Sequence, residues 1–180
     1  RVLAAWEDGS LMVGEPNGRV HELPPHAHNV YAANFDPTGA RVLTASFDTT
    51  ARSAAADGQG VPRVFLGNRL PLYRQAVDAS GRWYATGCYD GSIRVWDLAA
   101  PTLEITLRGH SKGVYGVQLD PSGERLATVG REGELRLWDA RDGRALATLA
   151  GGNESLNKAT FDPGGKHIAT ATRTGVVELW

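Results

Sequence analysis

Residues 109–149 read GHSKGVYGVQLDPSGERLATVGREGELRLWDARDGRALATL, and this stretch predicts short strands joined by tight turns. Over residues 113–119 apolar side chains bracket a short half-buried strand, and the Asp-Pro-Ser-Gly sequence at 120–123 supplies a turn. A second strand is expected directly after this turn, over residues 125–129. The first half of the stretch therefore predicts an antiparallel pair.

The second half of the same stretch repeats the arrangement. Polar and apolar residues alternate with period two over 134–138, as expected for a strand in a sheet with one solvent-exposed face. Asp142 and Gly143 then turn the chain into a fourth strand over 145–149. No window of the chain shows the apolar recurrence at three and four residues that an amphipathic helix needs. We therefore predict an all-β chain.

This stretch is one copy of a repeat whose copies are 42 residues apart, with no gaps between them. The turn recurs in one register as Asp36-Pro37-Thr38-Gly39, Asp78-Ala79-Ser80-Gly81, Asp120-Pro121-Ser122-Gly123 and Asp162-Pro163-Gly164-Gly165. One further position is threonine in all four copies: Thr44, Thr86, Thr128 and Thr170. Two others hold one residue type in three copies: Gly67, Gly109 and Gly151; Trp96, Trp138 and Trp180. The period is that of one supersecondary unit rather than of a single strand.

A period near 42 that opens with Gly109-His110 and closes with Trp138-Asp139 is typical of a four-stranded propeller blade. Over essentially its whole length the chain resembles the WD-repeat family of β-propellers. The resemblance implies blades of four antiparallel strands.

Counting strands predicts an incomplete arc of three full and two partial blades. The expected blades are residues 1–23 (partial), 24–65, 66–107, 108–149 and 150–180 (partial). Because closed rings have about 4–8 blades, we expect the rest of the propeller outside these 180 residues, in a longer polypeptide. The abundant Ala, Arg and Gly resemble WD-repeat regions of bacterial multidomain proteins. That likeness implies a scaffold or sensor inside a larger signalling or effector protein.

Composition restricts the compartment and the partners. The chain has 42% hydrophobic residues and 22 glycines, a composition typical of a globular protein. Its net charge of −1 gives no overall electrostatic attraction to nucleic acid or anionic membranes. No apolar run approaches the roughly 20 residues of a membrane span, so no membrane partner is expected. The single cysteine, Cys88, excludes an intrachain disulfide and fits a reducing compartment. We therefore expect a cytoplasmic location.

The family resemblance also implies a buried hydrogen-bonded set of His, Ser or Thr, Asp and Trp in many blades. No blade of this chain keeps all four. In that order the copies read His26, Thr44, Asp48 and Ala54; Asn68, Thr86, Asp90 and Trp96; His110, Thr128, Glu132 and Trp138; Gly152, Thr170, Thr174 and Trp180. Since these residues recur blade after blade, we expect them to be structural rather than catalytic, and a Glu or Asn could still reach the partner atoms.

No catalytic, cofactor or metal site is predicted. His26 and His28 have the spacing of a metal pair, but no third ligand stands at a recognisable interval. Cys88 has no histidine partner in its own repeat, so a small buried side chain is expected rather than a nucleophile. The glycines follow turn positions and form no phosphate-binding loop.

Two repeat positions should surround the central channel on one face, according to the resemblance. One position holds Tyr31, Tyr73, Tyr115 and Asn157, and the other holds Phe47, Tyr89, Arg131 and Arg173. Aromatic and arginine side chains are enriched in interface hot spots. We name Tyr31, Phe47, Tyr73, Tyr89, Tyr115, Arg131 and Arg173 the binding face and predict that it binds a protein or peptide, either a separate chain or another domain of the same one.

Three other interpretations remain open. Each tyrosine could have only a structural role, with its ring packed against the loops between blades and its hydroxyl exposed to solvent. A propeller enzyme would need acids, histidines or a metal converging in the channel, where this chain has aromatic and arginine residues. Nucleic acid could stack on the same side chains, but that mode needs a basic field, and the overall charge is near zero. We therefore predict a non-enzymatic interaction module.

Overall fold

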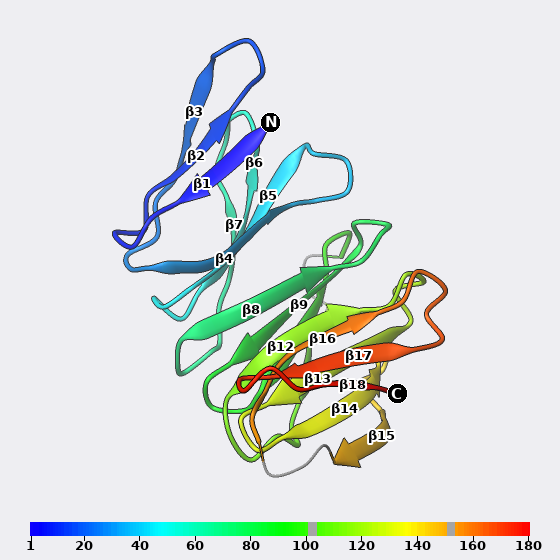
Figure 1. Ribbon diagram of the computed structural model, residues 1–180. Coiled ribbons are helices and arrows are strands. Elements are labelled where there is room, and N and C mark those ends of the chain that lie inside the picture. The colour runs from blue at the N-terminus through cyan, green and yellow to red at the C-terminus, as the bar shows by residue number, and fades with distance from the viewer. Residues whose placement is uncertain (101–103, 151–153) are drawn as a thin grey trace. The chain divides into compact units, whose positions relative to one another are not determined.

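The computed structural model describes residues 1–100, 104–150 and 154–180, and every regular element in these ranges is a β-strand (Figure 1). The prediction of an all-β chain is confirmed. The described residues contain no helical segment with the length and hydrophobicity that a bilayer crossing requires.

Within the described ranges, eighteen strands form five separate antiparallel sheets, and in each sheet the strands follow one another in chain order. The two three-stranded sheets are β1 (Val2–Ala5), β2 (Leu11–Gly14) and β3 (Val20–Leu23), and β16 (Leu156–Phe161), β17 (Ile168–Thr172) and β18 (Val177–Leu179). The four-stranded sheets are β4 (Val30–Phe35), β5 (Arg41–Ser46), β6 (Ala51–Ala55) and β7 (Arg63–Phe65); β8 (Leu72–Val77), β9 (Trp83–Cys88), β10 (Ile93–Asp97) and β11 (Glu104–Leu107); and β12 (Val114–Leu119), β13 (Arg125–Gly130), β14 (Glu134–Asp139) and β15 (Ala145–Ala150). Three complete and two partial four-stranded units are thus confirmed.

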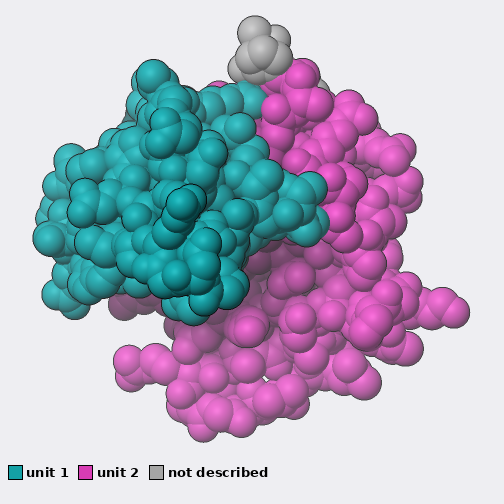
Figure 2. Space-filling view, turned by 90° about the horizontal axis from the view of Figure 1, so that it is seen from above, with its two compact units in different colours: residues 1–73 teal, residues 74–180 magenta. Residues whose placement is uncertain are grey.

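Residues 1–73 and 74–180 form two compact units, coloured separately in Figure 2. The boundary falls inside β8. In the first unit the core lies between the sheets β1–β3 and β4–β7. Its buried members are Leu11, Val13, Leu23, Val42 and Ala56, with Leu3, Val30, Ala33 and Phe35 packed against them.

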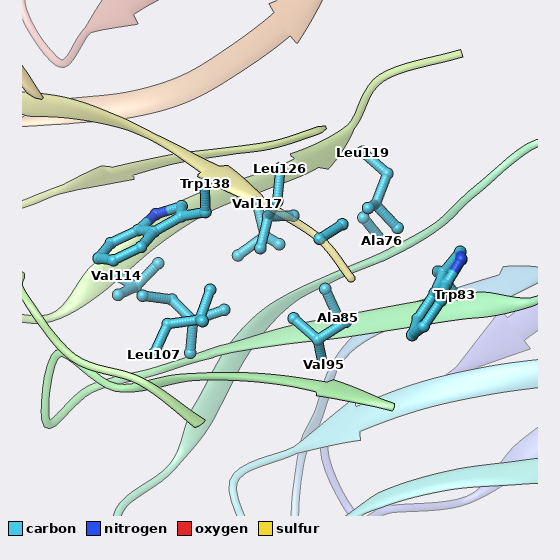
Figure 3. Close-up of a cluster of buried hydrophobic side chains, with 12 residues drawn as sticks. Ala76, Trp83, Ala85, Val95, Leu107, Val114, Val117, Leu119, Leu126 and Trp138 are labelled. Atoms are coloured by element: carbon cyan, nitrogen blue, oxygen red, sulfur yellow. The ribbon is translucent and has the colours of Figure 1, made fainter. Parts of the chain in front are cut away.

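The second unit has two apolar clusters. The larger one joins the sheets β8–β11 and β12–β15, and Figure 3 shows its side chains converging between the strands. Leu126 in β13 is fully buried there, and Trp138 in β14 is 3% exposed. The other cluster joins β12–β15 to β16–β18 through Val129, Leu135, Leu156 and Ile168. The sheet β12–β15 therefore buries apolar side chains against both of its neighbours in this unit.

The turn between the second and third strands of a repeat contains a left-handed residue. The φ angles of Gly9, Gly91, Gly133 and Gly175 are +91°, +85°, +86° and +94°. Thr49 occupies the same repeat position with φ +71° and is the one non-glycine residue of positive φ in the described chain. At Gly91 glycine is required for a second reason, because an added Cβ would lie 2.5 Å from the carbonyl oxygen of His110.

The first strands of three sheets, β4, β12 and β16, carry a β-bulge at the position predicted to face the channel. Pairing shifts register between Val30 and Ala32, between Val114 and Gly116, and between Leu156 and Lys158. The residues inside these shifts are Tyr31, Tyr115 and Asn157. A bulged residue leaves the pairing ladder and its side chain is re-aimed. The fold thus turns these three side chains out of the regular alternation of the strand.

Candidate functional site

In the first unit, the aromatic residues of the binding face lie together. The rings of Tyr31 and Tyr73 have centroids 4.7 Å apart, and those of Tyr31 and Phe47 are 6.0 Å apart. His28 extends the group, with its ring 4.8 Å from that of Phe47. These four residues are called the aromatic cluster below. Tyr31 is 42% exposed, so the cluster presents an aromatic surface to solvent.

The backbone holds the aromatic cluster in place. Phe47 N donates to Asn29 O at 2.8 Å, which ties the turn after β5 to the segment before β4. Ser46 Oγ donates to the carbonyl oxygens of His28 and Asn29 at 3.0 and 2.8 Å. The sequence interpretation missed His28 as a surface residue and weighed it only as a metal ligand. Its place just before the first strand of a repeat was the available signal.

In the second unit, Tyr89 and Arg131 are neighbours. Arg131 Nη1 donates to the Tyr89 hydroxyl at 3.5 Å, and Tyr89 is 39% exposed. Gly113 lies close to Tyr89, since an added Cβ would lie 3.1 Å from the Tyr89 ring. The Arg131 backbone is fixed on both sides, by its N–H to Gly113 O at 3.0 Å and by Ser155 Oγ to its carbonyl at 2.9 Å.

The two remaining residues of the binding face differ in exposure. Tyr115 lies half-buried in the bulge of β12, and Arg173 is exposed in the turn between β17 and β18. No hydrogen bond or ring contact joins Arg173 to another residue of the binding face within the described ranges.

The hydrogen-bonded set is most complete in the sheet β12–β15. Trp138 Nε1 donates to Thr128 Oγ1 at 2.9 Å, and Thr128 Oγ1 lies 2.7 Å from His110 Nε2. The other ring nitrogen of His110 contacts the Glu132 carboxylate, so the glutamate reaches the atom that an aspartate would serve. Gly130 leaves room for the longer side chain, because an added Cβ would lie 2.7 Å from both Glu132 oxygens. Burial lowers the pKa of His110, and the bond to Glu132 opposes that shift.

A second histidine set lies in the sheet β4–β7. His26 Nε2 is 2.7 Å from Thr44 Oγ1, and His26 Nδ1 is 2.8 Å from Asp48 Oδ2. Asp48 also accepts from Thr50 Oγ1 at 2.7 Å and from Ala27 N at 3.0 Å. Burial acts to raise the pKa of Asp48, but the hydrogen bonds from Thr50, His26 and Ala27 outweigh it and lower the pKa to about 2. Ala54 occupies the tryptophan position of this repeat, so the set has no indole donor.

The other two sets are partial. In the last sheet Trp180 Nε1 donates to Thr170 Oγ1 at 3.0 Å, while the position of Gly152 lies outside the described residues, as does that of Gly151. Asn68 does not replace histidine: its amide donates to Thr49 O at 3.4 Å, and Thr86 Oγ1 is buried without a hydrogen bond from the described part of the chain.

The remaining two members of that repeat are placed differently. Trp96 stacks on Tyr84 with ring centroids 5.6 Å apart. Asp90 accepts from Ser92 N at 2.9 Å within its own turn.

One group has the composition of a metal site. Ligand atoms of His110, Glu132 and Glu134 lie within 4.8 Å of one another. Glu134 Oε2, however, already accepts from Arg136 Nε and Nη2 at 3.0 and 2.7 Å, and both ring nitrogens of His110 are engaged. A cation placed there would compete with a guanidinium and break the buried set. The arrangement is that of a structural network.

The Asp48 set predicts a specific pH dependence. Asp48→Asn is expected to lower the free energy of unfolding by about 1–3 kcal/mol at neutral pH, because charge-assisted hydrogen bonds are replaced by weaker ones. A folded pKa of about 2 lies below the ordinary value of about 3.9, so the carboxylate stabilises the fold fully above pH ~4 and loses that effect as pH falls through about 2. Urea unfolding at several pH values should show the gap between the two chains closing over this window. A gap that stays constant down to the lowest pH would contradict this account.

Three segments of the chain match a known repeat family. The profile described as "WD domain, G-beta repeat" matches residues 17–53, 62–97 and 101–139. The chain belongs to the WD40 repeat family. WD40 repeats generally mediate protein–protein interaction, and WD40 domains are generally non-catalytic.

Short segments of this WD40 chain resemble three proteins named pre-mRNA-splicing factor PRP46. The match is 61% identical over 28 residues in Eremothecium gossypii, 43% over 35 residues in Debaryomyces hansenii and 56% over 32 residues in Kluyveromyces lactis. These segments make up 16%, 19% and 18% of this chain, and 7%, 8% and 7% of the relatives. The chain therefore matches less than a tenth of each relative's length. The implied likeness to bacterial multidomain proteins gains no support from these matches.

Proposed function

We propose that this chain is a docking module that binds a protein or peptide through the binding face. The aromatic cluster carries the proposal: four rings in mutual contact, held by backbone bonds, with Tyr31 42% exposed. Clustered aromatic side chains provide large contact area at a low cost in conformational entropy, and they dominate binding energy in many interfaces.

The proposal extends to the setting of the module. We propose that the five sheets are blades at residues 1–23, 24–65, 66–107, 108–149 and 150–180, and that the rest of the propeller lies outside this sequence. The role is that of a scaffold or sensor in a larger signalling or effector protein in the cytoplasm. Local likeness to proteins named pre-mRNA-splicing factors fits a scaffold in a protein assembly.

Tyr31→Ala tests the docking role. We expect the variant to lose about 2 kcal/mol of binding free energy, which is about a thirtyfold weaker affinity, because an exposed ring of the aromatic cluster is removed. Proteins that co-purify with the full-length protein can be quantified by mass spectrometry, and the strongest can be titrated by calorimetry.

Val61→Ala is the matched control, since Val61 is 95% exposed between β6 and β7 and lies outside the binding face. Partners recovered equally by the parent and both variants would contradict docking through the aromatic cluster.

A further inference from the structure

We infer that Arg131 and Arg173 of the second unit bind carboxylates of an acidic peptide segment, a step that rests on the proposed docking function. The two arginines hold the same repeat position, in the turns after β13 and β17 of neighbouring sheets that share one apolar cluster. Both side chains are exposed.

Among the described residues, five arginines of this unit form ion pairs with acidic residues of the same chain. The ion pairs are Arg82–Asp97, Arg94–Glu104, Arg125–Asp120, Arg136–Glu134 and Arg141–Glu124. Arg131 and Arg173 have no acidic group within 4.0 Å among the described residues. Arg108 and Arg144 also lack such a pair there, but neither lies at a binding-face position. The exposed Lys112, next to the glycine that accepts from Arg131 N, adds positive charge beside this pair.

The acidic side chains that lie beside Tyr89 and Arg131, or that contact the turn holding Arg173, already have hydrogen-bond partners. Asp90 accepts from Ser92 Oγ at 2.5 Å, Glu132 contacts His110, and Glu154 accepts from Thr174 Oγ1. An acid from a partner would therefore meet arginines that no described carboxylate of the chain neutralises.

The geometry around Arg131 suits a carboxylate. Its backbone forms hydrogen bonds with Gly113 O and Ser155 Oγ, and its guanidinium donates a hydrogen bond to the Tyr89 hydroxyl. A planar guanidinium held in this way can form two parallel hydrogen bonds to one carboxylate. The overall charge of −1 gives no long-range basic field of the kind that nucleic-acid binding uses, so a peptide is the occupant that the charges favour.

Fluorescence anisotropy with the full-length protein tests this inference. The probes are a short labelled peptide of alternating glutamate and leucine, its glutamine counterpart and a labelled single-stranded RNA. We expect the glutamate peptide to bind at least about tenfold more tightly than the glutamine peptide, and the double variant Arg131→Gln/Arg173→Gln to remove that preference. Arg141→Gln, which removes an exposed but paired arginine, should leave it unchanged.

Equal affinity for both peptides, or a preference that survives the double variant, would overturn the inference, as would tighter binding of the RNA. The docking function is judged separately. If Tyr31→Ala loses its protein partner while the double arginine variant keeps it, docking stands and the acidic-peptide inference fails.

Discussion

Trp138→Ala is expected to lower the free energy of unfolding by about 3–5 kcal/mol, the range found when a buried aromatic residue is truncated. The indole is 3% exposed, packs in the cluster between β8–β11 and β12–β15 (Figure 3), and donates to Thr128 Oγ1. Alanine would leave a cavity and take one partner from the threonine that also contacts His110. Urea titration followed by circular dichroism measures the loss.

Two variants separate the contributions at this position. Trp138→Phe keeps most of the apolar volume and removes the hydrogen bond, so it should cost much less than alanine. Trp6→Ala removes an indole that is 44% exposed and should change stability little. If Trp138→Ala were as mild as Trp6→Ala, the buried tryptophan would not hold these two sheets together.

Gly91→Ala is expected to cost about 2–5 kcal/mol of unfolding free energy. A left-handed conformation costs an L-residue about 1–2 kcal/mol, and overpacking adds about 1–3 kcal/mol. The φ of Gly91 is +85°, and the new Cβ would lie 2.5 Å from His110 O and 2.9 Å from Lys112 O. Both contacts are with backbone atoms, so the loop that positions the His110 ring would have to move.

Gly175→Ala provides the control for backbone strain alone. Gly175 has the same repeat position and φ +94°, but apart from its chain neighbours no described residue has an atom within 4 Å of its added Cβ. Its loss should stay near the strain cost of about 1–2 kcal/mol. Thermal unfolding of both variants under one set of conditions gives the comparison, and equal losses would show that the close approach at Gly91 has no effect.

The repeat made most of the fold predictable from sequence. Turn residues at a fixed period place the strands, and the alternation over 134–138 predicts β14 within one residue of its observed end at Asp139. Histidine, threonine and aspartate at matched positions also indicated the contacts among His26, Thr44 and Asp48. Period and residue type suffice for these three residues, because their contacts follow the repeat pattern without substitution.

Interactions that depend on local shape could not be predicted in this way. Glu132 reaches His110 because the neighbouring position is Gly130, and nothing in the repeat pattern links those two residues. Asn68 turns to the carbonyl of Thr49 rather than acting as a histidine. The contact between Arg131 and the Tyr89 hydroxyl joins residues of different repeats, so a pattern within one repeat does not indicate it.

The bulges that contain Tyr31, Tyr115 and Asn157 have a consequence for how such a surface diversifies. A residue outside the pairing ladder can change its chemistry without disturbing the alternation that buries its neighbours. Tyrosine and asparagine already occupy equivalent bulges in this one chain. If the binding face recognises a partner as proposed, single substitutions at these sites should change what is bound while the sheets stay intact.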